Sequence, residues 1–262
     1  MENIKSKGVC VFCTKEFAKA GITRHLNTHL INPQKPGTEG KSYHLRIEPD
    51  TRWGATPYFL NVLVNGTSTF EELDDFLREI WLECCGHMSS FSDPKHQRGE
   101  GMWDIMEAYD LLDEGKIDEY EHIMSNAKGE IPKRKNFQEV LYEGMKLRYE
   151  YDFGSTTELQ LVVLKELPYT AKDIELLSRN EPLKIMCDSC GKKPAQVLCS
   201  VCAGYENEAF FCKDCAKKHK RTCKDFADYA ALPVVNSPRT GICGYEGGVI
   251  DTERDKPFQL TE

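Results

Sequence analysis

The middle of the chain alternates apolar and polar positions in the way that strands of a half-buried sheet do. Five segments have this pattern and are predicted to be strands: 42–49, 58–66, 87–92, 146–153 and 158–167. The last two are separated by a short stretch around Gly154, which favours a closing hairpin. We expect these segments to pair in one sheet.

Helical spacing of apolar residues occurs between these strands. Residues 70–86 carry an apolar face with Ser68 or Thr69 as the N-cap: Phe70, Leu73, Phe76, Leu77, Ile80 and Trp81. Residues 102–126 predict two short helices broken at Gly115, inserted between strands, and 137–143 predict another short helix. The order of elements indicates an α+β domain over residues 42–168, with a small sheet packed on a helix.

Two segments border this domain. Residues 31–41 (INPQKPGTEGK) are rich in Pro and Gly and are predicted to be an extended linker. Residues 169–186 are predicted to be a bridging helix, capped by Thr170, with Ile174, Leu176 and Leu177 on its buried side.

Composition is that of a globular protein. The chain has 262 residues, 40% hydrophobic and 29% charged, which favours about two domains. No apolar run approaches the roughly 18 residues that a membrane span needs, so no membrane association is expected. The N-terminal sequence MENIKSKGVC lacks the apolar core of a signal peptide. We therefore expect a cytoplasmic protein.

The first thirty residues contain a zinc-ligand pattern. Cys10, Cys13, His25 and His29 are spaced C-x2-C-x11-H-x3-H, with a helix predicted from about Lys15 to Leu30. This spacing is typical of two-cysteine, two-histidine zinc fingers, with one residue fewer than usual between the second Cys and the first His. A unit of this size buries little core, so metal binding is expected to supply its folding energy.

A second cysteine-rich segment, 187–224, predicts two more zinc sites. Its ligands fall in four pairs: Cys187 with Cys190, Cys199 with Cys202, Cys212 with Cys215, and His219 with Cys223. The third and fourth pairs lie within twelve residues that are also predicted to form a helix, so they cannot easily surround one ion. This favours a crossed arrangement, in which the first and third pairs hold one ion and the second and fourth pairs hold the other. His219 and Cys223, four apart, would then share one helical face. The sequence therefore predicts three zinc ions in all.

Two alternatives exist for these cysteines. A disulfide framework is disfavoured because C-x2-C repeats in a reducing compartment indicate metal. The second alternative is that Cys243 replaces Cys223 as the eighth ligand. Cys243 belongs to the segment 225–262, which has no clear helical or strand period after Ala231 and is rich in Gly and Pro, so it is predicted to be a loop-rich tail.

Charge is divided unevenly along the chain. The net charge is −8, yet residues 1–30 carry five Lys and Arg against two acidic residues, and 187–224 carry eight against four. Nucleic acid, if bound, would therefore meet residues 1–30 or the basic edge 213–221 rather than the acidic middle. In the finger, the candidate contacts are Lys15, Lys19, Arg24 and Asn27.

Several residues of the central domain resemble a known family. The runs His87 to Phe91, Val140 to Gly144 and Tyr149 to Gly154 resemble the plasmid Ri open-reading-frame-three-like domain, also called the insertion-element passenger family, over residues 42–168. The resemblance implies a compact α+β domain with appended Cys-rich modules. The family pattern continues with Asp, Trp and His, where this chain has Ser155, Thr157 and Leu159. A site built from that Asp and His is therefore not expected here.

The double zinc module also resembles known folds. Residues 187–224 are similar to B-box and treble-clef domains, with Cys223 where B-boxes generally have His.

No motif of a known enzyme class occurs in the sequence. The chain has no phosphate-binding glycine loop, nucleophile elbow or metalloprotease helix. The only catalytic candidates are His44, His87, Asp152 and the adjacent Cys84 and Cys85, and no spacing forces them together. We assign no catalytic residues and no cofactor other than zinc.

Two functions fit the sequence. The first is a non-enzymatic adaptor with structural zinc sites that binds a protein partner, because ions held by four protein ligands have no open position for catalysis. The alternative is a nucleic-acid-binding regulator associated with mobile elements, acting through the basic zinc modules.

Overall fold

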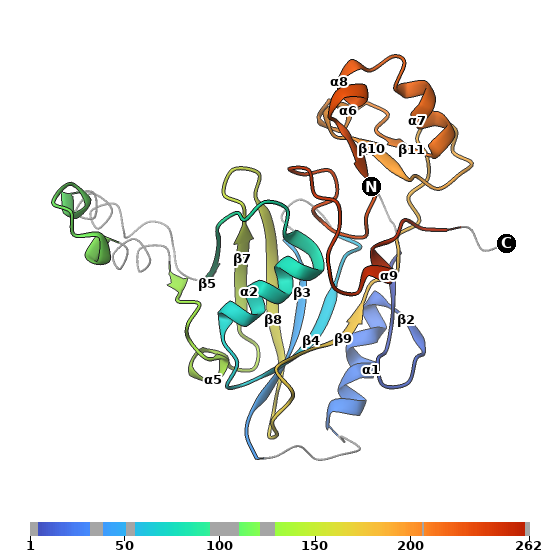
Figure 1. The fold of residues 1–262 in the computed structure, drawn as a ribbon. Coiled ribbons are helices and arrows are strands. Elements are labelled where there is room, and N and C mark those ends of the chain that lie inside the picture. Colours follow the sequence, from blue (N-terminus) through green and yellow to red (C-terminus); the bar gives the residue numbers. More distant parts are fainter. Residues whose placement is uncertain are drawn as a thin grey trace.

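The structure is a computed structural model that describes residues 5–31, 39–50, 56–94, 110–120, 129–205 and 207–259. The fold is α+β, as the sequence predicts, with a large antiparallel sheet and small Cys/His modules at both ends (Figure 1). The predicted linker 31–41 and the predicted helices of 102–126 lie partly outside the described residues. Within 110–120, helical residues stand on both sides of Gly115, which lies in a turn with φ +77°.

Within the described residues, the central sheet has seven strands in the order β6-β5-β7-β8-β3-β4-β9, and all neighbouring pairs are antiparallel. The five predicted strands are confirmed, with small shifts at their ends. The bounds are β3 (Ser42–Pro49), β4 (Leu60–Asn65), β5 (Ser89–Ser92), β6 (Glu130–Ile131), β7 (Lys146–Tyr151), β8 (Thr157–Leu167) and β9 (Ile174–Arg179). A short helix, α5 (Phe137–Val140), precedes β7.

One face of this sheet is covered by α2 (Phe70–Leu77), which crosses in front of β7, β8 and β3 in Figure 1. Thr69 caps it through a capping box with Glu72, so the second of the two predicted N-caps is correct. The helix continues as a π-helical turn, η2 (Arg78–Leu82), which buries Trp81 completely. Its apolar face, with Leu73 and Leu77, packs on the strands to form the main core.

The predicted bridging helix over 169–186 is wrong, because this segment contains the edge strand β9 instead. Strand β9 pairs with β4, with Val64 opposite Ile174 and Leu60 opposite Arg179. The apolar positions Ile174, Leu176 and Leu177 fit a helix face and a strand equally well at this length. Pairing decides between them, since β4 would otherwise expose its backbone groups at the sheet edge.

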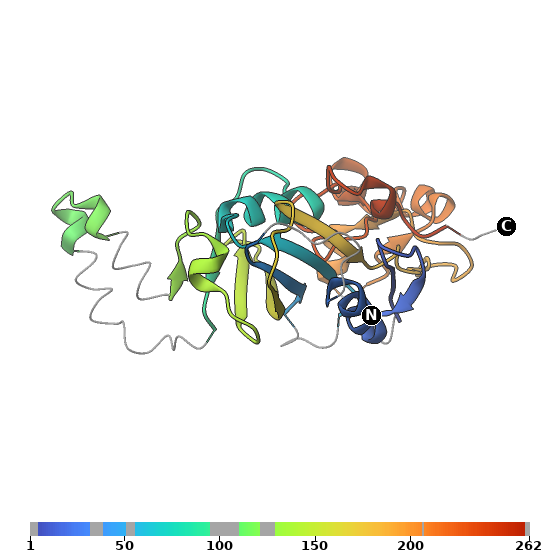
Figure 2. The same cartoon turned by 90° about the horizontal axis from the view of Figure 1, so that it is seen from below.

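The opposite face of the sheet holds the N-terminal finger (Figure 2). The finger consists of β1 (Lys7–Val9), β2 (Glu16–Ala18) and α1 (Lys19–Ile31). Residues 15–18, predicted to begin the helix, belong instead to the end of a knuckle and to β2. Three buried residues of α1 pack on Phe59 and Leu63 of the β4 segment: Ile22, Leu26 and Leu30. The finger therefore shares a core with the central domain.

Backbone contacts reinforce this attachment. Strand β1 runs beside β9, where the amide of Glu181 donates to the Lys7 carbonyl at 2.8 Å. The amide of Val11 donates to the Leu177 carbonyl at 3.1 Å. A Cβ at Gly8 would come within 2.6 Å of the Ser178 hydroxyl, so only glycine allows this close approach.

The cysteine-rich segment forms a separate small core. It contains a three-stranded sheet in the order β11-β10-β12 and three short helices. Their bounds are β10 (Val197–Cys199), α6 (Ser200–Gly204), β11 (Phe210–Phe211), α7 (Lys213–His219), α8 (Lys224–Asp228) and β12 (Ala231–Pro233). The module extends beyond the predicted boundary at 224, because β12, from the predicted tail, pairs with β10.

The remaining tail, which contains α9 (Thr252–Asp255), covers the C-terminal end of η2. The hydroxyl of Ser237 donates to the Trp81 carbonyl at 2.7 Å, and the amide of Val249 donates to the Glu79 carbonyl at 2.7 Å. These bonds satisfy carbonyl groups that a helix end leaves without partners. The predicted loop-rich tail is thus a packed part of the molecule. Among the helices of the described residues, none is long and apolar enough to cross a membrane.

Candidate metal centres

Among the residues that the structure describes, four clusters of Cys and His side chains can each hold a metal ion. In every cluster the four ligand atoms lie within 4.8 Å of one another. With Zn–S near 2.3 Å and Zn–N near 2.0 Å, ligand atoms of a tetrahedral site lie about 3.3 to 3.8 Å apart. All twelve cysteines are free, and four pairs of their sulfurs lie 3.8 to 4.0 Å apart, against about 2.05 Å in a disulfide. The arrangement fits metal ligation and differs from a disulfide framework.

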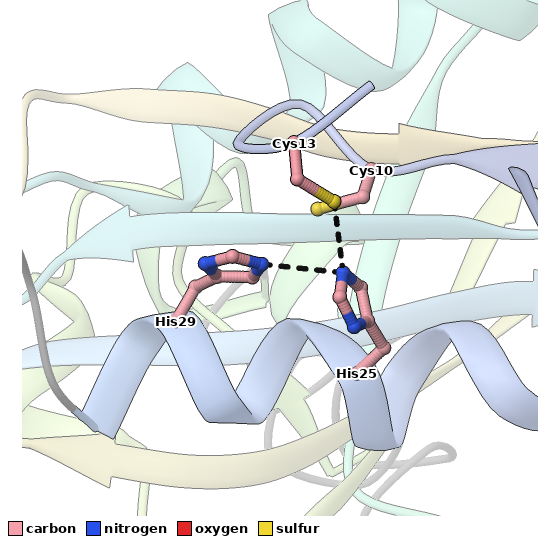
Figure 3. A group of neighbouring side chains, drawn as sticks. All are labelled: Cys10, Cys13, His25 and His29. Carbon is pink, nitrogen blue, oxygen red and sulfur yellow. Dashed lines mark hydrogen bonds between the residues drawn. The ribbon is translucent and has the colours of Figure 1, made fainter. Parts of the chain in front are cut away.

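The first cluster is the predicted set of Cys10, Cys13, His25 and His29 (Figure 3). The cysteines come from a tight knuckle after β1, in which the amide of Thr14 donates to the Cys10 carbonyl at 2.8 Å. The histidines lie one turn apart on α1, and their Nε2 atoms are 3.2 Å apart. Cys13 Sγ lies 3.2 Å from the Nε2 of His25.

Aromatic rings support the finger site. Phe17 stacks on the ring of His25 at a centroid distance of 3.9 Å, which fixes the orientation of the imidazole. Burial lowers the pKa of His25, and the neighbouring His29 and Lys15 lower it further. A lowered pKa favours the neutral imidazole, which is the form that binds a metal.

The second cluster joins Cys187 and Cys190 with Cys212 and Cys215. The first pair lies in a knuckle closed by the amide of Gly191, which donates to the Cys187 carbonyl at 2.8 Å and has φ +61°. The second pair lies at the start of α7. The sulfurs of Cys190 and Cys212 are 4.0 Å apart. This is the crossed arrangement that the sequence favours.

The third cluster contains Cys199, Cys202, His219 and Cys223. Cys202 Sγ lies 3.5 Å from the Nε2 of His219 and 4.0 Å from the Cys223 sulfur. His219 and Cys223 do not share a helical face as predicted, because α7 ends at His219 and Cys223 is the N-cap of α8. The amide of Cys223 still donates to the His219 carbonyl at 2.9 Å, which keeps the two ligands together.

Thiol acidity differs among these ligands. The backbone amides of Lys192 and Lys193 lower the pKa of Cys190 to about 6, which favours its thiolate. Burial raises the pKa of Cys202 and of Cys215 to about 12. A divalent cation reverses this preference, because coordination deprotonates a thiol outright. Cys202 and Cys215 therefore need a bound cation to be thiolates at neutral pH.

The fourth cluster was not predicted. It consists of Cys84, Cys85, His87 and Cys243, and three of its members follow η2 while the fourth comes from the tail. Cys243 is 3.8 Å from the Cys85 sulfur and is not in the site of Cys223, where the alternative interpretation placed it. The adjacent cysteines were visible in the sequence, but nothing local connects them to a residue more than 150 positions later.

The catalytic candidates are only partly brought together. His44 is fully buried between the sheet and α1 and lies apart from the others, against Asn27 and Asn61. Cys85 Sγ lies 3.0 Å from the Nε2 of His87, but the Asp152 carboxylate approaches this same nitrogen, at 3.5 Å. A nucleophile, base and orienting acid would need the two ring nitrogens separately.

Cys85 also has the wrong acidity for a nucleophile. Its hydrogen bond with Cys84, followed by burial and Cys243, raises its pKa to about 11. A reactive cysteine requires a lowered pKa. The geometry and the electrostatics are those of grouped thiols and not of a catalytic pair.

The finger residues considered for nucleic-acid contact divide into two groups. Lys19 pairs with Glu48 at 3.2 Å and donates to the Thr56 carbonyl at 2.6 Å, and Asn27 contacts His44. The central domain engages both of these side chains. Lys15 and Arg24 are exposed.

The residues at which the chain departs from the family pattern have structural contacts. Thr157 is buried and its hydroxyl accepts from Arg239 at 3.0 Å, while the Ser155 carbonyl accepts from the same guanidinium at 3.1 Å. Leu159 belongs to the main core. In this chain, Ser155 and Thr157 hydrogen-bond the tail residue Arg239, and Leu159 packs in the core.

Comparison with known proteins gives little more. No family model matches the chain, and no curated protein matches it. Among solved structures, it is similar to the crystal structure of a protein of unknown function, MM3350 from Methanosarcina mazei Go1, at 17% identity over 54% of this chain and 68% of that chain, with a TM-score of 0.34. A likeness at this level carries no functional argument, and the family resemblance of residues 42–168 stays a prediction.

Proposed function

We propose that this protein is a non-enzymatic, zinc-binding interaction protein in which three structural zinc ions hold the two terminal modules. The observation that carries this proposal is the complete set of four protein ligands in the finger cluster and in both clusters of the double module. Four protein ligands close the tetrahedron, so no position remains for a reacting water.

The double module offers a surface for a protein partner. Tyr205 and Tyr229, which follow α6 and α8, are 75% and 69% exposed. Tyrosine is enriched at protein interfaces because it combines a large apolar ring with a hydrogen-bonding hydroxyl. Their exposure supports a partner that docks on this module.

A pulldown with the full chain tests this proposal. Protein with intact zinc, Tyr205→Ala/Tyr229→Ala protein and a Tyr142→Ala control are used as baits in native lysate, with and without nuclease. Tyr142 is also half exposed but lies in the central domain. The proposal predicts a nuclease-resistant partner that the double variant loses and the control keeps. A partner retained by the double variant, or one lost with nuclease, would contradict it.

The second candidate function is nucleic-acid binding through α7 and the turn after it. Five basic residues are exposed along this edge: Lys213, Lys217, Lys218, Lys220 and Arg221. Since Lys19 and Asn27 face the central domain, the finger contributes less to this function than its sequence suggests.

Salt dependence tests the second candidate. Binding that neutralises phosphates weakens linearly in log affinity with log salt, and Lys217→Gln/Lys218→Gln should reduce that slope by about 2. Lys146→Gln, an exposed lysine on β7, is the control. An affinity that does not change with salt would exclude this function.

A further inference from the structure

The cluster formed by Cys84, Cys85, His87 and Cys243 is built from two distant parts of the chain. The first three residues leave the end of η2, and Gly86 between them has φ +76°, which turns the backbone sharply. Cys243 arrives in the tail with φ +49°. A left-handed conformation at a non-glycine residue costs about 1 kcal/mol and persists only where surrounding contacts require it.

The ligand atoms have the separations of a tetrahedral site. The sulfurs of Cys84 and Cys85 are 3.8 Å apart, and so are those of Cys85 and Cys243. The Nε2 of His87 lies 3.0 Å from Cys85 and 3.2 Å from Cys243. The two sulfur–sulfur distances match the upper end of the roughly 3.3 to 3.8 Å expected around zinc, and the two nitrogen–sulfur distances lie slightly below this range. The sulfurs are much too far apart for a disulfide.

Buried charge beside the cluster suits a thiolate site. Arg239 is fully buried, and its guanidinium lies 3.5 Å from the Cys84 sulfur. Three thiolates and one Zn²⁺ would carry a net charge of −1, and a neighbouring guanidinium stabilises such an anion. The same Arg239 is fixed by Asp152 at 2.6 Å.

Asp152 lies beside the cluster, with its Oδ2 3.5 Å from the Nε2 of His87, but other groups hold both of its oxygens. Its Oδ1 accepts from the amides of Gly154 and Ser155, at 3.0 and 3.1 Å, and its Oδ2 accepts from Arg239. With both oxygens engaged, the carboxylate orients Arg239 and leaves Cys84 as the fourth ligand.

We propose that Cys84, Cys85, His87 and Cys243 bind a fourth zinc ion, which fastens the C-terminal tail to the end of η2. The three thiols lose their protons to solvent on binding, and the imidazole binds in its neutral form. All twelve cysteines of the chain then serve as metal ligands. This site does not depend on the three zinc sites or on the partner binding proposed above.

The site differs from the other three in its exposure. Cys85 and Cys243 are exposed, whereas each of the other clusters contains at least one buried cysteine. Solvent and chelators therefore reach this zinc directly. We expect it to exchange faster than the other ions.

Native mass spectrometry of the full chain, prepared anaerobically with reductant, tests the proposal. Wild type, Cys243→Ser and a Val249→Ser control are compared for zinc ions per chain. Val249 is a 73% exposed tail residue with no ligand atom in its side chain. Wild type and control should carry one zinc more than Cys243→Ser, whatever number the other sites hold.

Two further measurements keep this test decisive. Cys85→Ser removes a ligand from the other segment and should also lose one zinc. After cobalt substitution, wild type should show more thiolate-to-cobalt absorption than either variant. Equal zinc counts in wild type and both ligand variants would overturn the proposal, as would a Cys85–Cys243 disulfide mapped in the reduced, anaerobic wild type.

Discussion

Asn27 of the finger helix and His44 of the central sheet are in contact, with the Asn27 Oδ1 atom 2.9 Å from the His44 Nδ1 atom. A polar residue at this position of a finger helix is a natural candidate for contact with a nucleic-acid base. Here it faces a fully buried histidine of β3. The finger therefore packs against the central domain, and Asn27 is engaged in that contact.

Mutation of the shared core tests this attachment. Leu26→Ala should destabilise the whole protein by about 2 to 5 kcal/mol, because Leu26 is fully buried among residues of both the finger and the sheet. Ile31→Ala, at an exposed position of the same helix, should change the stability by less than about 0.5 kcal/mol. Denaturant unfolding followed by a probe in the central sheet measures both. An unchanged sheet transition in Leu26→Ala would mean that the finger folds separately.

His44 predicts a specific pH dependence. Burial lowers its pKa to about 4 in the folded protein, against an ordinary value of 6.5. The folded state thus binds this proton less readily than the unfolded chain. The contribution of neutral His44 to the free energy of unfolding is complete above about pH 6.5. It is lost as the pH falls toward 4, by on the order of 3 kcal/mol.

Comparison with a variant isolates this effect from the other titrating groups. His44→Gln cannot titrate, so its unfolding free energy should fall less than that of wild type between pH 7 and 5. Urea unfolding at a series of pH values provides the measurement. If the unfolding free energies of the two proteins change in parallel with pH, His44 is not the source of the pH dependence.

A buried ion pair anchors the tail. Arg179 of β9 is fully buried and donates to the Asp255 carboxylate and to the Asn236 carbonyl. Asp255→Ala should cost about 3 to 5 kcal/mol because it removes the carboxylate closest to the buried guanidinium and leaves Asp251, at 3.3 Å, as its remaining acidic partner. Glu253→Ala, at an exposed pair with Lys256, should cost about 1 kcal/mol at most. Thermal unfolding compares them, and similar losses in both variants would contradict a role for Asp255 as the anchor.

Metal removal should affect the molecule unevenly. Half of the eight buried residues in the double-module core are cysteine ligands, so little apolar core remains without metal. The central sheet has a large core of its own. Hydrogen exchange after chelation should show loss of protection in 187–223 while the β3 and β8 amides stay protected. Retained protection in 187–223 would show that the module folds without metal.

The sequence predicts three of the clusters because their ligands are close along the chain. A C-x2-C knuckle brings two sulfurs together by local geometry alone, and the histidine pair of the finger needs only one helix turn. The fourth cluster depends on how the tail packs, and Gly248 illustrates that packing: a Cβ there would lie 2.5 Å from the Glu79 carbonyl oxygen. Such tertiary contacts leave no periodic pattern in the sequence, so the sequence does not predict the fourth cluster.

The errors in the predicted fold have a similar cause. Residues 174–179 have apolar spacing that fits two kinds of element, and only the free edge of β4 selects a strand. Strand β4 is buried on both faces, with Val62 in the main core and Leu63 against the finger. Its continuous apolar run was a sign that both faces are covered. The covering element, α1, is nonetheless 29 residues upstream of β4.

The zinc content of the untagged, reduced protein tests the central claim most directly. Metal analysis with a thiol count should give three zinc ions for the finger and the double module and a fourth for the Cys243 cluster, with no disulfides. Fewer than three bound ions per chain, or cysteines bridged to one another in the reduced protein, would contradict the account.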